Sequence, residues 1–405
     1  MDTQRLLDGI DDKEALEFLA AMIRFKSYSG EPGETELARH MVDHMTTLGL
    51  DAALQHVEAE RFNAIGTLKG TGGGKSLLFN GHMDTNPATD DWTVDPWGGL
   101  YDDDFIFGIG VSNMKAGDAA AFVAVKTLSD AGVKLKGDII LEYVVGELQG
   151  GVGTVKAIEE GVRADCFINM EPTDLNGMTL HAGSYNAVIE FTGVTRHISK
   201  REEAVDAVAA AATFIPRFNA MTFSGAANED HATVNRANIG VMRGSLTPDF
   251  HDWRPPQIGD FARLSGTVRY GPSQSEESTL NDIRELLGEL EAEVPGLQTK
   301  AFKQHAGERP SMRPFEVDRD APLVKAVGGA YRQVRGTEQP QGPVKPYCFY
   351  GTDAAHLLHR LDMPGIVCGP GGRYNTMPDE RVDIPDYLDM IRIYMLAIME
   401  ICEIA

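Results

Sequence analysis

Four short apolar runs, each ending in polar or glycine-rich residues, constrain the fold of this chain more than any other feature. They are "LLFNGHMD", "GDIILEYVVGE", "ADCFINMEPT" and "MPGIVCGPGG". Segments with helical patterning lie between them, such as "MKAGDAAAFVAVKTLSDAG". Apolar strands that alternate with helices are typical of a parallel sheet covered on both faces. The sequence therefore predicts an α/β domain whose mainly parallel sheet is covered by helices.

The patterning changes near residue 180 and changes back after residue 299. "GSYNAVIEFTGV" alternates like a half-exposed strand, and two helical segments with several antiparallel-type strands follow it. The first style resumes at about residue 320 with "APLVKAVGGAYRQVRG". A chain of 405 residues is also too long for one ordinary core. We therefore expect a discontinuous α/β domain at 1–179 and 299–405, with an α+β domain inserted at 180–298.

Composition excludes several classes of partner. The formal charge of -23 argues against binding to nucleic acid or to anionic membranes. No apolar run approaches the roughly 18 residues that a membrane-spanning helix needs, and the acidic start "MDTQRLLDGIDDKEAL" is unlike a signal peptide. The four cysteines are scattered, which disfavours a disulfide scaffold or a thiolate zinc site. These features together predict a cytoplasmic protein.

Reactive side chains follow the predicted strands. His82 and Asp84 end the first apolar run, Glu147 the second and Glu171 the third, while a glycine loop with Tyr374 follows the fourth. In open α/β sheets, ligands bind beyond the carboxyl ends of the strands. His82 and Asp84 are two residues apart and face the same way on an extended segment. The carboxylate can thus orient a histidine metal ligand, and the set indicates a hydrolytic metal site.

The ordered motifs resemble a known family. "GHMDTNP", "GIGVSNMKAG", "GELQGG", "MEPT", "GTDAAHL" and "GPGGRYNTMPDERV" occur in the order of the di-zinc aminoacylase family, which includes acetylornithine deacetylase, succinyl-diaminopimelate desuccinylase and glutamate carboxypeptidase. The resemblance covers nearly the whole chain. It implies a metallopeptidase-like catalytic domain with an inserted lid and dimerisation domain, so a homo-oligomer formed through the lid is expected.

The resemblance also implies that one of the family's two metal sites is lost. Asn113 stands where the family has its bridging aspartate, Leu148 replaces a glutamate ligand and Thr376 replaces a histidine ligand. His82 and Glu171 match the ligands of the other metal. The expected cofactor is therefore one labile divalent transition metal per chain, manganese or zinc. Asn113 is expected to offer a neutral ligand oxygen, and Tyr374 is a candidate fourth ligand.

Further roles follow from the same resemblance. Glu147 occupies the place of the family's general base, and Asp84 that of the orienting carboxylate. In the lid, His197 matches the histidine that stabilises the developing oxyanion of a neighbouring subunit's site. Asn238 and Arg269 match positions that hold a substrate carboxylate, a task for which the arginine fork is well suited.

Structural alternatives remain for several of these residues. Asn113 precedes a predicted helix and could serve as its N-cap. Glu171, before a proline, could be a turn residue. Tyr374 could be a packing residue, and Arg269 could pair with a carboxylate of the lid.

Three functions fit the sequence. The first is single-metal hydrolysis of a C–N bond in a small carboxylate-bearing substrate, most favourably a nitro-activated aromatic amine, because such a ring accepts the charge that a second metal would otherwise stabilise. The resembled family includes chemistry of this kind, the deamination of 5-nitroanthranilate, so the resemblance implies that compound as the candidate substrate. The second is a single-metal amidohydrolase or deacylase acting on N-acyl amino acids. The third is a non-catalytic protein that binds a small acid or a protein partner.

Overall fold

In the computed structural model, the described residues 3–251, 255–304 and 309–405 form two compact units. The first unit comprises Met1–Leu180, Phe315–Tyr347 and Thr352–Ala405, and the second comprises His181–Pro314 and Cys348–Gly351. The predicted boundary at 298 and 299 needs correction. Strand β12 (Gln298–Lys303) pairs with β9 (Gly183–Thr192) in the sheet of the second unit, so the chain cannot leave that unit before this strand ends.

The first unit is built on an eight-stranded sheet whose central strands β5, β3, β6 and β15 run parallel. Antiparallel pairs flank this centre at β2 and at β7. The mainly parallel sheet predicted from the sequence is thus confirmed. In spatial order the strands are β1 (Asp51–Glu58), β2 (Arg61–Leu68), β5 (Ile139–Val144), β3 (Leu77–His82), β6 (Cys166–Asn169), β15 (Gly365–Val367), β7 (Gly177–Met178) and β14 (Gln341–Gly342). Two further pairs are β16 (Arg381–Asp383) with β4 (Phe105–Phe107), and β13 (Phe315–Glu316) with β8 (Leu180–His181).

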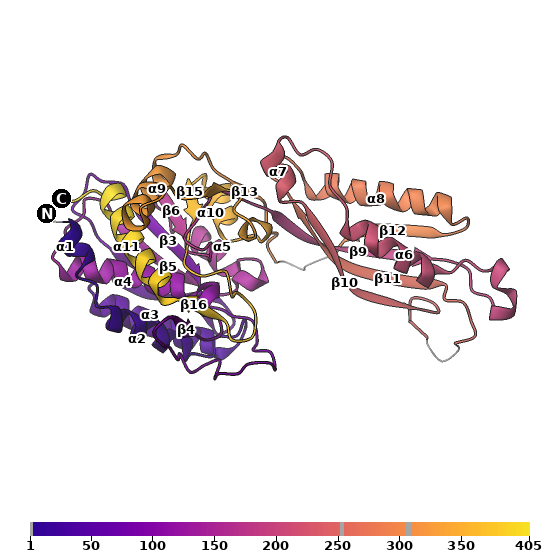
Figure 1. The fold of residues 1–405 in the computed structure, drawn as a ribbon, viewed down its shortest axis with the longest axis horizontal. Coiled ribbons are helices and arrows are strands. Elements are labelled where there is room, and N and C mark those ends of the chain that lie inside the picture. The colour runs from indigo at the N-terminus through magenta and orange to yellow at the C-terminus, as the bar shows by residue number, and fades with distance from the viewer. Residues whose placement is uncertain (1–2, 252–254, 305–308) are drawn as a thin grey trace. The chain divides into compact units, whose positions relative to one another are not determined.

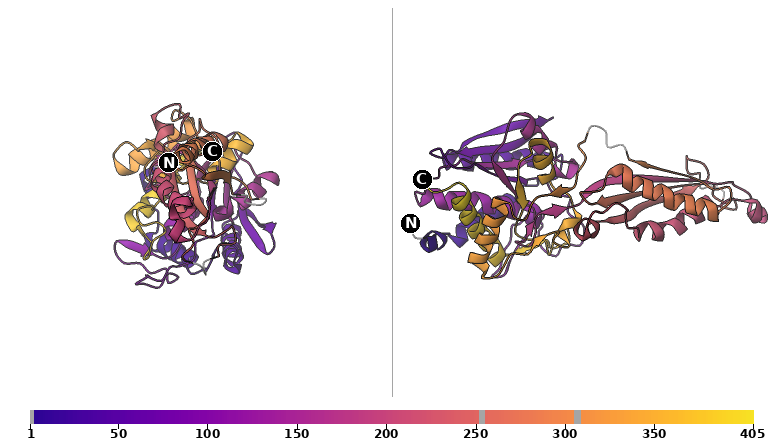
Figure 2. Two further views of the ribbon diagram at one scale, coloured as in Figure 1. Left: turned by 90° about the vertical axis from the view of Figure 1, so that its right-hand side faces the viewer. Right: turned by 90° about the horizontal axis from the view of Figure 1, so that it is seen from above.

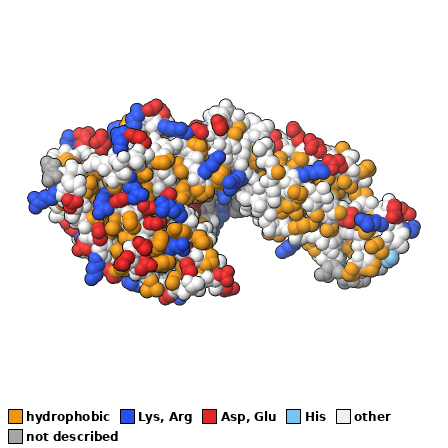
Figure 3. Space-filling view, viewed as in Figure 1, with side chains coloured by type: hydrophobic (Ala, Val, Ile, Leu, Met, Phe, Trp, Pro, Cys, Tyr) orange, Lys and Arg blue, Asp and Glu red, His pale blue; other side chains and the backbone are white. Residues whose placement is uncertain are grey.

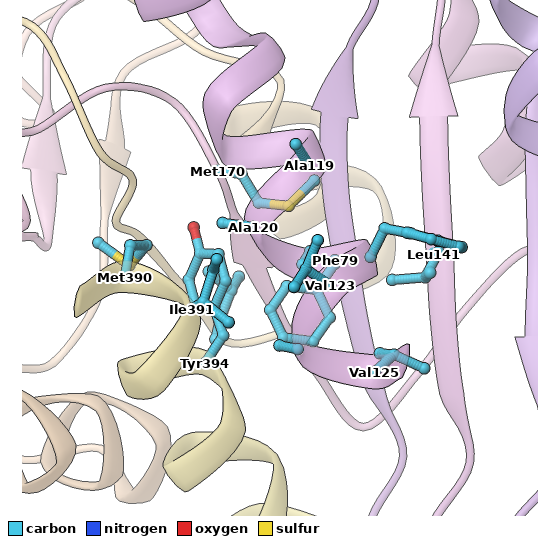
Figure 4. Packing of buried hydrophobic residues seen from close by; sticks show 14 of the residues in the cluster. Phe79, Ala119, Ala120, Val123, Val125, Leu141, Met170, Met390, Ile391 and Tyr394 are labelled. Carbon is cyan, nitrogen blue, oxygen red and sulfur yellow. The ribbon is translucent and has the colours of Figure 1, made fainter. Parts of the chain in front are cut away.

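Helices cover both faces of this sheet (Figures 1 and 2). Successive side chains of a strand point to opposite faces, and strand β3 shows the result. Phe79 packs edge-on against Tyr394 of α11, with ring centroids 5.1 Å apart, in the apolar core of Figure 4. Asn80 faces the other way and donates to the hydroxyl of Thr154 in α5. The helices are α1 (Thr3–Leu7), α2 (Asp12–Ile23), α3 (Pro32–Thr47), α4 (Ala116–Asp130), α5 (Val152–Glu159), α9 (Pro322–Arg335), α10 (Ala354–Leu361) and α11 (Ile384–Ile401).

The second unit is an α+β domain, as the sequence predicts. Its four-stranded sheet has the order β10 (Arg236–Ser245), β11 (Phe261–Tyr270), β9 and β12, with every neighbouring pair antiparallel. Its helices are α6 (Ala207–Asn219), α7 (Glu229–Thr233) and α8 (Glu276–Glu293). A separate hydrophobic cluster joins this sheet to α6 and α8, and includes Ile189, Phe214 and Ile283. Two independent cores account for the two units.

The visible surface of the first unit carries charged side chains of both signs. On the face of the first unit seen in Figure 3, acidic and basic side chains are intermixed, so the acidic excess does not gather in one patch there. None of the described helices is both long enough and apolar enough to cross a bilayer.

Truncation of Phe79 is expected to destabilise the first unit. Its ring is fully buried between the sheet and α11, and Phe→Ala changes in cores cost about 3–5 kcal/mol. Phe79→Ala should lower the free energy of unfolding in urea by this amount. Leu100→Ala, at an exposed site, should change it by less than about 0.5 kcal/mol. Equal effects of the two changes would contradict this packing.

Candidate metal site

Three adjacent parallel strands bring three ligand-type side chains to one edge of the sheet. His82 ends β3, Glu147 follows β5 in the short turn Glu147–Gln149, and Glu171 follows β6. All three are buried, and each offers a ligand atom within 4.8 Å of the others. The parallel register sets this convergence, because His82 lies opposite Val144 and Asn80 lies opposite Asn169.

The ring of His82 is oriented toward the cluster. Its Nδ1 lies 2.8 Å from the backbone carbonyl of Asp84 and 3.6 Å from that residue's carboxylate. Its Nε2 lies 2.9 Å from Oδ1 of Asn113 and 3.4 Å from a carboxylate oxygen of Glu171. A histidine whose Nδ1 donates to a carbonyl presents the lone pair of Nε2 to a metal. The oxygens of Asn113 and Glu171 surround that lone pair.

Asn113 does not cap the helix that follows it. Helix α4 begins at Ala116, and its N-cap residue is Lys115, without a side-chain cap hydrogen bond. The backbone N–H groups of Ser112 and Asn113 donate to Glu380 at 2.8 and 3.1 Å, which holds the segment in place. The N-cap alternative is therefore wrong, since the amide oxygen of Asn113 faces His82.

The carboxylate of Asp84 holds the turn that carries Glu147. It accepts the backbone N–H groups of Gly146, Glu147 and Leu148 at 2.9, 3.2 and 3.3 Å. The hydroxyl of Ser29 donates to it at 2.9 Å. The expected orientation of His82 by Asp84 therefore comes chiefly from the backbone carbonyl, while the carboxylate positions Glu147.

Sequence reasoning missed other residues that hold the same turn. Arg61 forms a buried two-pronged ion pair with Glu34 at 2.6 and 2.7 Å and donates to Gln149 at 2.7 Å. His356 lies in α10 and has its Nε2 2.9 Å from the carbonyl of Gly150. Arg61 and Glu34 belong to separate elements, so no local pattern reveals them. His356 belongs to the "GTDAAHL" motif, which was the available signal.

The electrostatics of the site favour a cation. Burial, and then the neighbouring Glu171, raise the pKa of Glu147 well above its usual value. Burial lowers the pKa of His82, but Glu171, Asp84 and Glu147 outweigh it and raise this pKa well above its usual value. Burial also raises the pKa of Asp353, close by, to about 7. Several buried carboxyl groups so close together need a positive counter-charge. The donor set therefore fits a divalent metal held by His82 and Glu171.

His82 and Asn113 border a cavity of about 160 Å³. Leu148 and Thr376 border it as well, and with Asn113 they are the residues that the resemblance places at the second metal's ligand positions. A larger groove of about 1130 Å³ lies among helices α1 to α4 and is bordered by none of these residues. The chemistry of the site therefore points to the smaller cavity.

The described contacts of Tyr374 are with other side chains. The guanidinium carbon of Arg381 lies 3.7 Å from the centre of its ring, and the ring of Phe105 packs edge-on at 5.8 Å. These contacts agree with the packing alternative, and ligation by Tyr374 stays a prediction.

The three lid residues belong to the second unit. His197 is exposed and its Nδ1 lies 3.0 Å from the hydroxyl of Ser199. Asn238 is exposed on β10, and Arg269 is half-buried at the end of β11. Their roles toward substrate stay predictions.

Comparisons with known proteins identify relatives of the whole chain. The model for the peptidase family M20/M25/M40 matches residues 78–400. An N-formyl-4-amino-5-aminomethyl-2-methylpyrimidine deformylase of Bacillus subtilis is 24% identical, with 96% of this chain and 95% of the relative covered. An acetylornithine deacetylase of Salmonella paratyphi B is 27% identical, with 91% and 92% covered. The solved aminopeptidase PepT of Bacillus cereus superposes with a TM-score of 0.76 at 18% identity, covering 98% of this chain and 100% of that one.

Removal of the imidazole at position 82 should abolish tight metal binding. Wild-type protein is expected to bind about one manganese or zinc ion per chain. His82→Ala should weaken this binding more than about 100-fold, because removing even groups behind metal ligands costs 10–100-fold. Titration calorimetry measures both values. His56→Ala, at an exposed position outside the cluster, is the matched control, and two ions per chain in the wild type would contradict the single site.

The raised pKa of Glu142 should make the free energy of unfolding decrease as the pH rises. Burial, and then the charge of Asp353, raise its pKa from 4.5 to about 8. The folded protein thus keeps a proton that the unfolded chain releases, so this group opposes folding increasingly as pH rises through that window. Glu142→Gln should lessen the decrease in unfolding free energy over the window, measured by urea denaturation. The exposed change Glu289→Gln should leave the pH dependence as it is; an unchanged dependence in Glu142→Gln would refute the assignment.

Proposed function

The chain belongs to the peptidase family M20/M25/M40, and from this premise we propose that it hydrolyses a C–N bond in a small carboxylate-bearing substrate with a single divalent metal. As a family member it is a metal-dependent hydrolase that acts on a non-peptide C–N bond. One observation supports the single-metal proposal above the others. His82, Glu147 and Glu171 cluster within ligand distance, whereas Leu148 and Thr376 border the neighbouring cavity without a charged donor.

A site of this kind suits a substrate that stabilises its own transition state. His82, Glu171 and Asn113 would hold the metal, which would supply a Lewis acid that makes a water molecule easier to deprotonate. Without a second metal, the oxyanion of an unactivated amide is stabilised less. A nitro-activated aromatic amine spreads the developing charge over its ring and nitro group. We therefore propose a 5-nitroanthranilate-type substrate.

We assign each site residue a separate role in this reaction. Glu147 takes a proton from water as the water oxygen bonds to the ring carbon that carries the amine. The C–N bond then breaks, and Glu147 returns the proton to the departing nitrogen. Water and 5-nitroanthranilate thus give 5-nitrosalicylate and ammonia. Asp84 keeps Glu147 in position, and we assign Arg269 and Asn238 to the substrate carboxylate and His197 to the developing negative charge.

Hydrolysis of an N-formyl or N-acyl amine is the second candidate. The similarity to a pyrimidine deformylase along nearly the whole chain favours it. In that reaction the same water and base would attack a formyl or acyl carbonyl, and the released products would be a carboxylic acid and an amine. Both candidates use Glu147 as the base and differ in the carbon that is attacked.

A homodimer formed through the lid is also proposed. Strand β10 lies at the edge of the lid sheet, and its Val241 and Met242 side chains are exposed. An edge strand with exposed apolar residues is a ready site for pairing with another chain, and two-fold symmetry is the commonest arrangement in homo-oligomers.

Replacement of the proposed base should remove turnover. We expect manganese- or zinc-loaded wild-type protein to release ammonia from 5-nitroanthranilate, and Glu147→Gln to lower kcat by about 10²–10⁴-fold, the usual contribution of a general base. Glu289→Gln is the control. Release of formate from an N-formyl aminopyrimidine, without ammonia from 5-nitroanthranilate, would select the second candidate instead.

The dimer has its own test. Light scattering of the wild type should give twice the chain mass of 44.1 kDa. Val241→Glu should shift the mass toward that of one chain, because it buries a charge in the interface. Ile404→Glu, exposed in the other unit, should leave the dimer intact. A monomeric wild type would refute the proposal.

A further inference from the structure

We propose that the cavity beside His82, where the family's second metal is expected, holds the aromatic ring of the substrate instead. This inference rests on the proposed function and deepens it, because it assigns the substrate class to particular side chains. It makes Leu148 and Met377 specificity-determining residues that contact the ring.

Among the described residues, each acid that borders the cavity already accepts backbone N–H groups. Asp84 and Glu380 are the two acids that border it. The oxygens of Asp84 accept three backbone N–H groups and one hydroxyl. Glu380 accepts the N–H groups of Ser112 and Asn113. Carboxylates already used in this way support the loop backbone and are poorly placed to become metal ligands.

Apolar side chains form much of the remaining wall. Ile109 is buried there, and Trp92 is half-buried. Leu148 and Met377 also border the cavity, although their side chains remain 37% and 44% exposed. Exposed apolar side chains that gather at a concave site are typical of ligand-binding grooves. A bound ring would cover both of them.

The volume and the polar groups fit one substituted ring. The cavity measures about 160 Å³, and an apolar protein cavity of about 150 Å³ is known to accept benzene. Asn86, Thr89 and Thr376 also border it, and their hydroxyl and amide groups can donate to nitro or carboxylate oxygens. His82 borders the cavity and lies within ligand distance of Glu147, so a ring seated here would lie beside the metal ligand and near the base.

The residues that stand in place of the second metal's ligands would therefore also make room for the ring. A glutamate at 148 would bring a charge into the ring's place, whereas leucine offers apolar contact. A histidine at 376 would be bulkier than the threonine found here. The same substitutions that remove a metal create room for a flat, apolar group.

Equilibrium binding tests this assignment without any turnover. The probe is 3-nitrobenzoate, which has the ring, nitro group and carboxylate of the proposed substrate but no amine to be displaced. Calorimetry on manganese-loaded protein compares the wild type with Leu148→Trp, in which the larger side chain fills the cavity. Leu100→Trp, equally a change of an exposed leucine but outside the cavity, is the matched control.

We expect the wild type to bind 3-nitrobenzoate and Leu148→Trp to bind it at least about tenfold more weakly, because the ring loses its apolar contacts. The metal content and the thermal midpoint should stay unchanged, as should the affinity of Leu100→Trp. If Leu148→Trp fails to fold, Met377→Trp, at a more exposed position, makes the same test. Failure of the wild type to bind the probe, or equal affinity in the cavity variants, would overturn the inference.

Turnover of 5-nitroanthranilate by the wild type separates this inference from the proposed function. If 3-nitrobenzoate binding depends on Leu148 but 5-nitroanthranilate is not turned over, the ring pocket is supported and the proposed reaction is contradicted. Turnover together with binding that is indifferent to Leu148 would contradict the pocket alone.

Discussion

The hydrogen bonds between the carboxylate of Asp84 and the turn that begins at Gly146 are the contacts on which the site depends. Asp84 is fully buried, and a buried carboxylate is tolerated only when donors surround it. Three backbone N–H groups and the hydroxyl of Ser29 meet that need. The same contacts join the end of β3, which carries His82, to the end of β5, which carries Glu147. Base and metal ligand are thereby held on one rigid frame.

The turn is held from other sides as well. Arg61 reaches it through Gln149, and His356 contacts the carbonyl of Gly150. A catalytic group needs its supporting contacts to keep it within a fraction of an ångström of the productive position. Several independent contacts on one short turn are an arrangement of this kind, and they explain why a 3-10 turn can serve as a platform for the base.

The proposed single-metal site and the proposed ring pocket would both follow from the substitutions that the resemblance implies. Asn113 keeps an oxygen near Nε2 of His82 but carries no charge. Leu148 and Thr376 border a cavity whose described acids, Asp84 and Glu380, already accept backbone N–H groups. The remaining negative charge lies on the side of Glu147 and Glu171, where burial and mutual repulsion disfavour ionisation of Glu147. These features support our proposal of one cation at this site and an apolar group in the space next to it.

Local patterns in the sequence determined much of this protein. The apolar runs predicted the central strands, and the residues after them predicted His82, Glu147 and Glu171 at one edge, because parallel strands deliver their ends to the same side. The ordered motifs likewise identified the family, and the substitutions that they imply at 113, 148 and 376 stay predictions. Only the tertiary structure decided that Asp84 holds a turn, and that Asn113 faces His82 and caps no helix. It also decided that Arg61 and Glu34 support the turn of Glu147. The extension of the second unit through β12 was likewise visible only in the structure. Each of these depends on contacts between segments far apart in the chain, and such contacts leave no periodicity in the sequence.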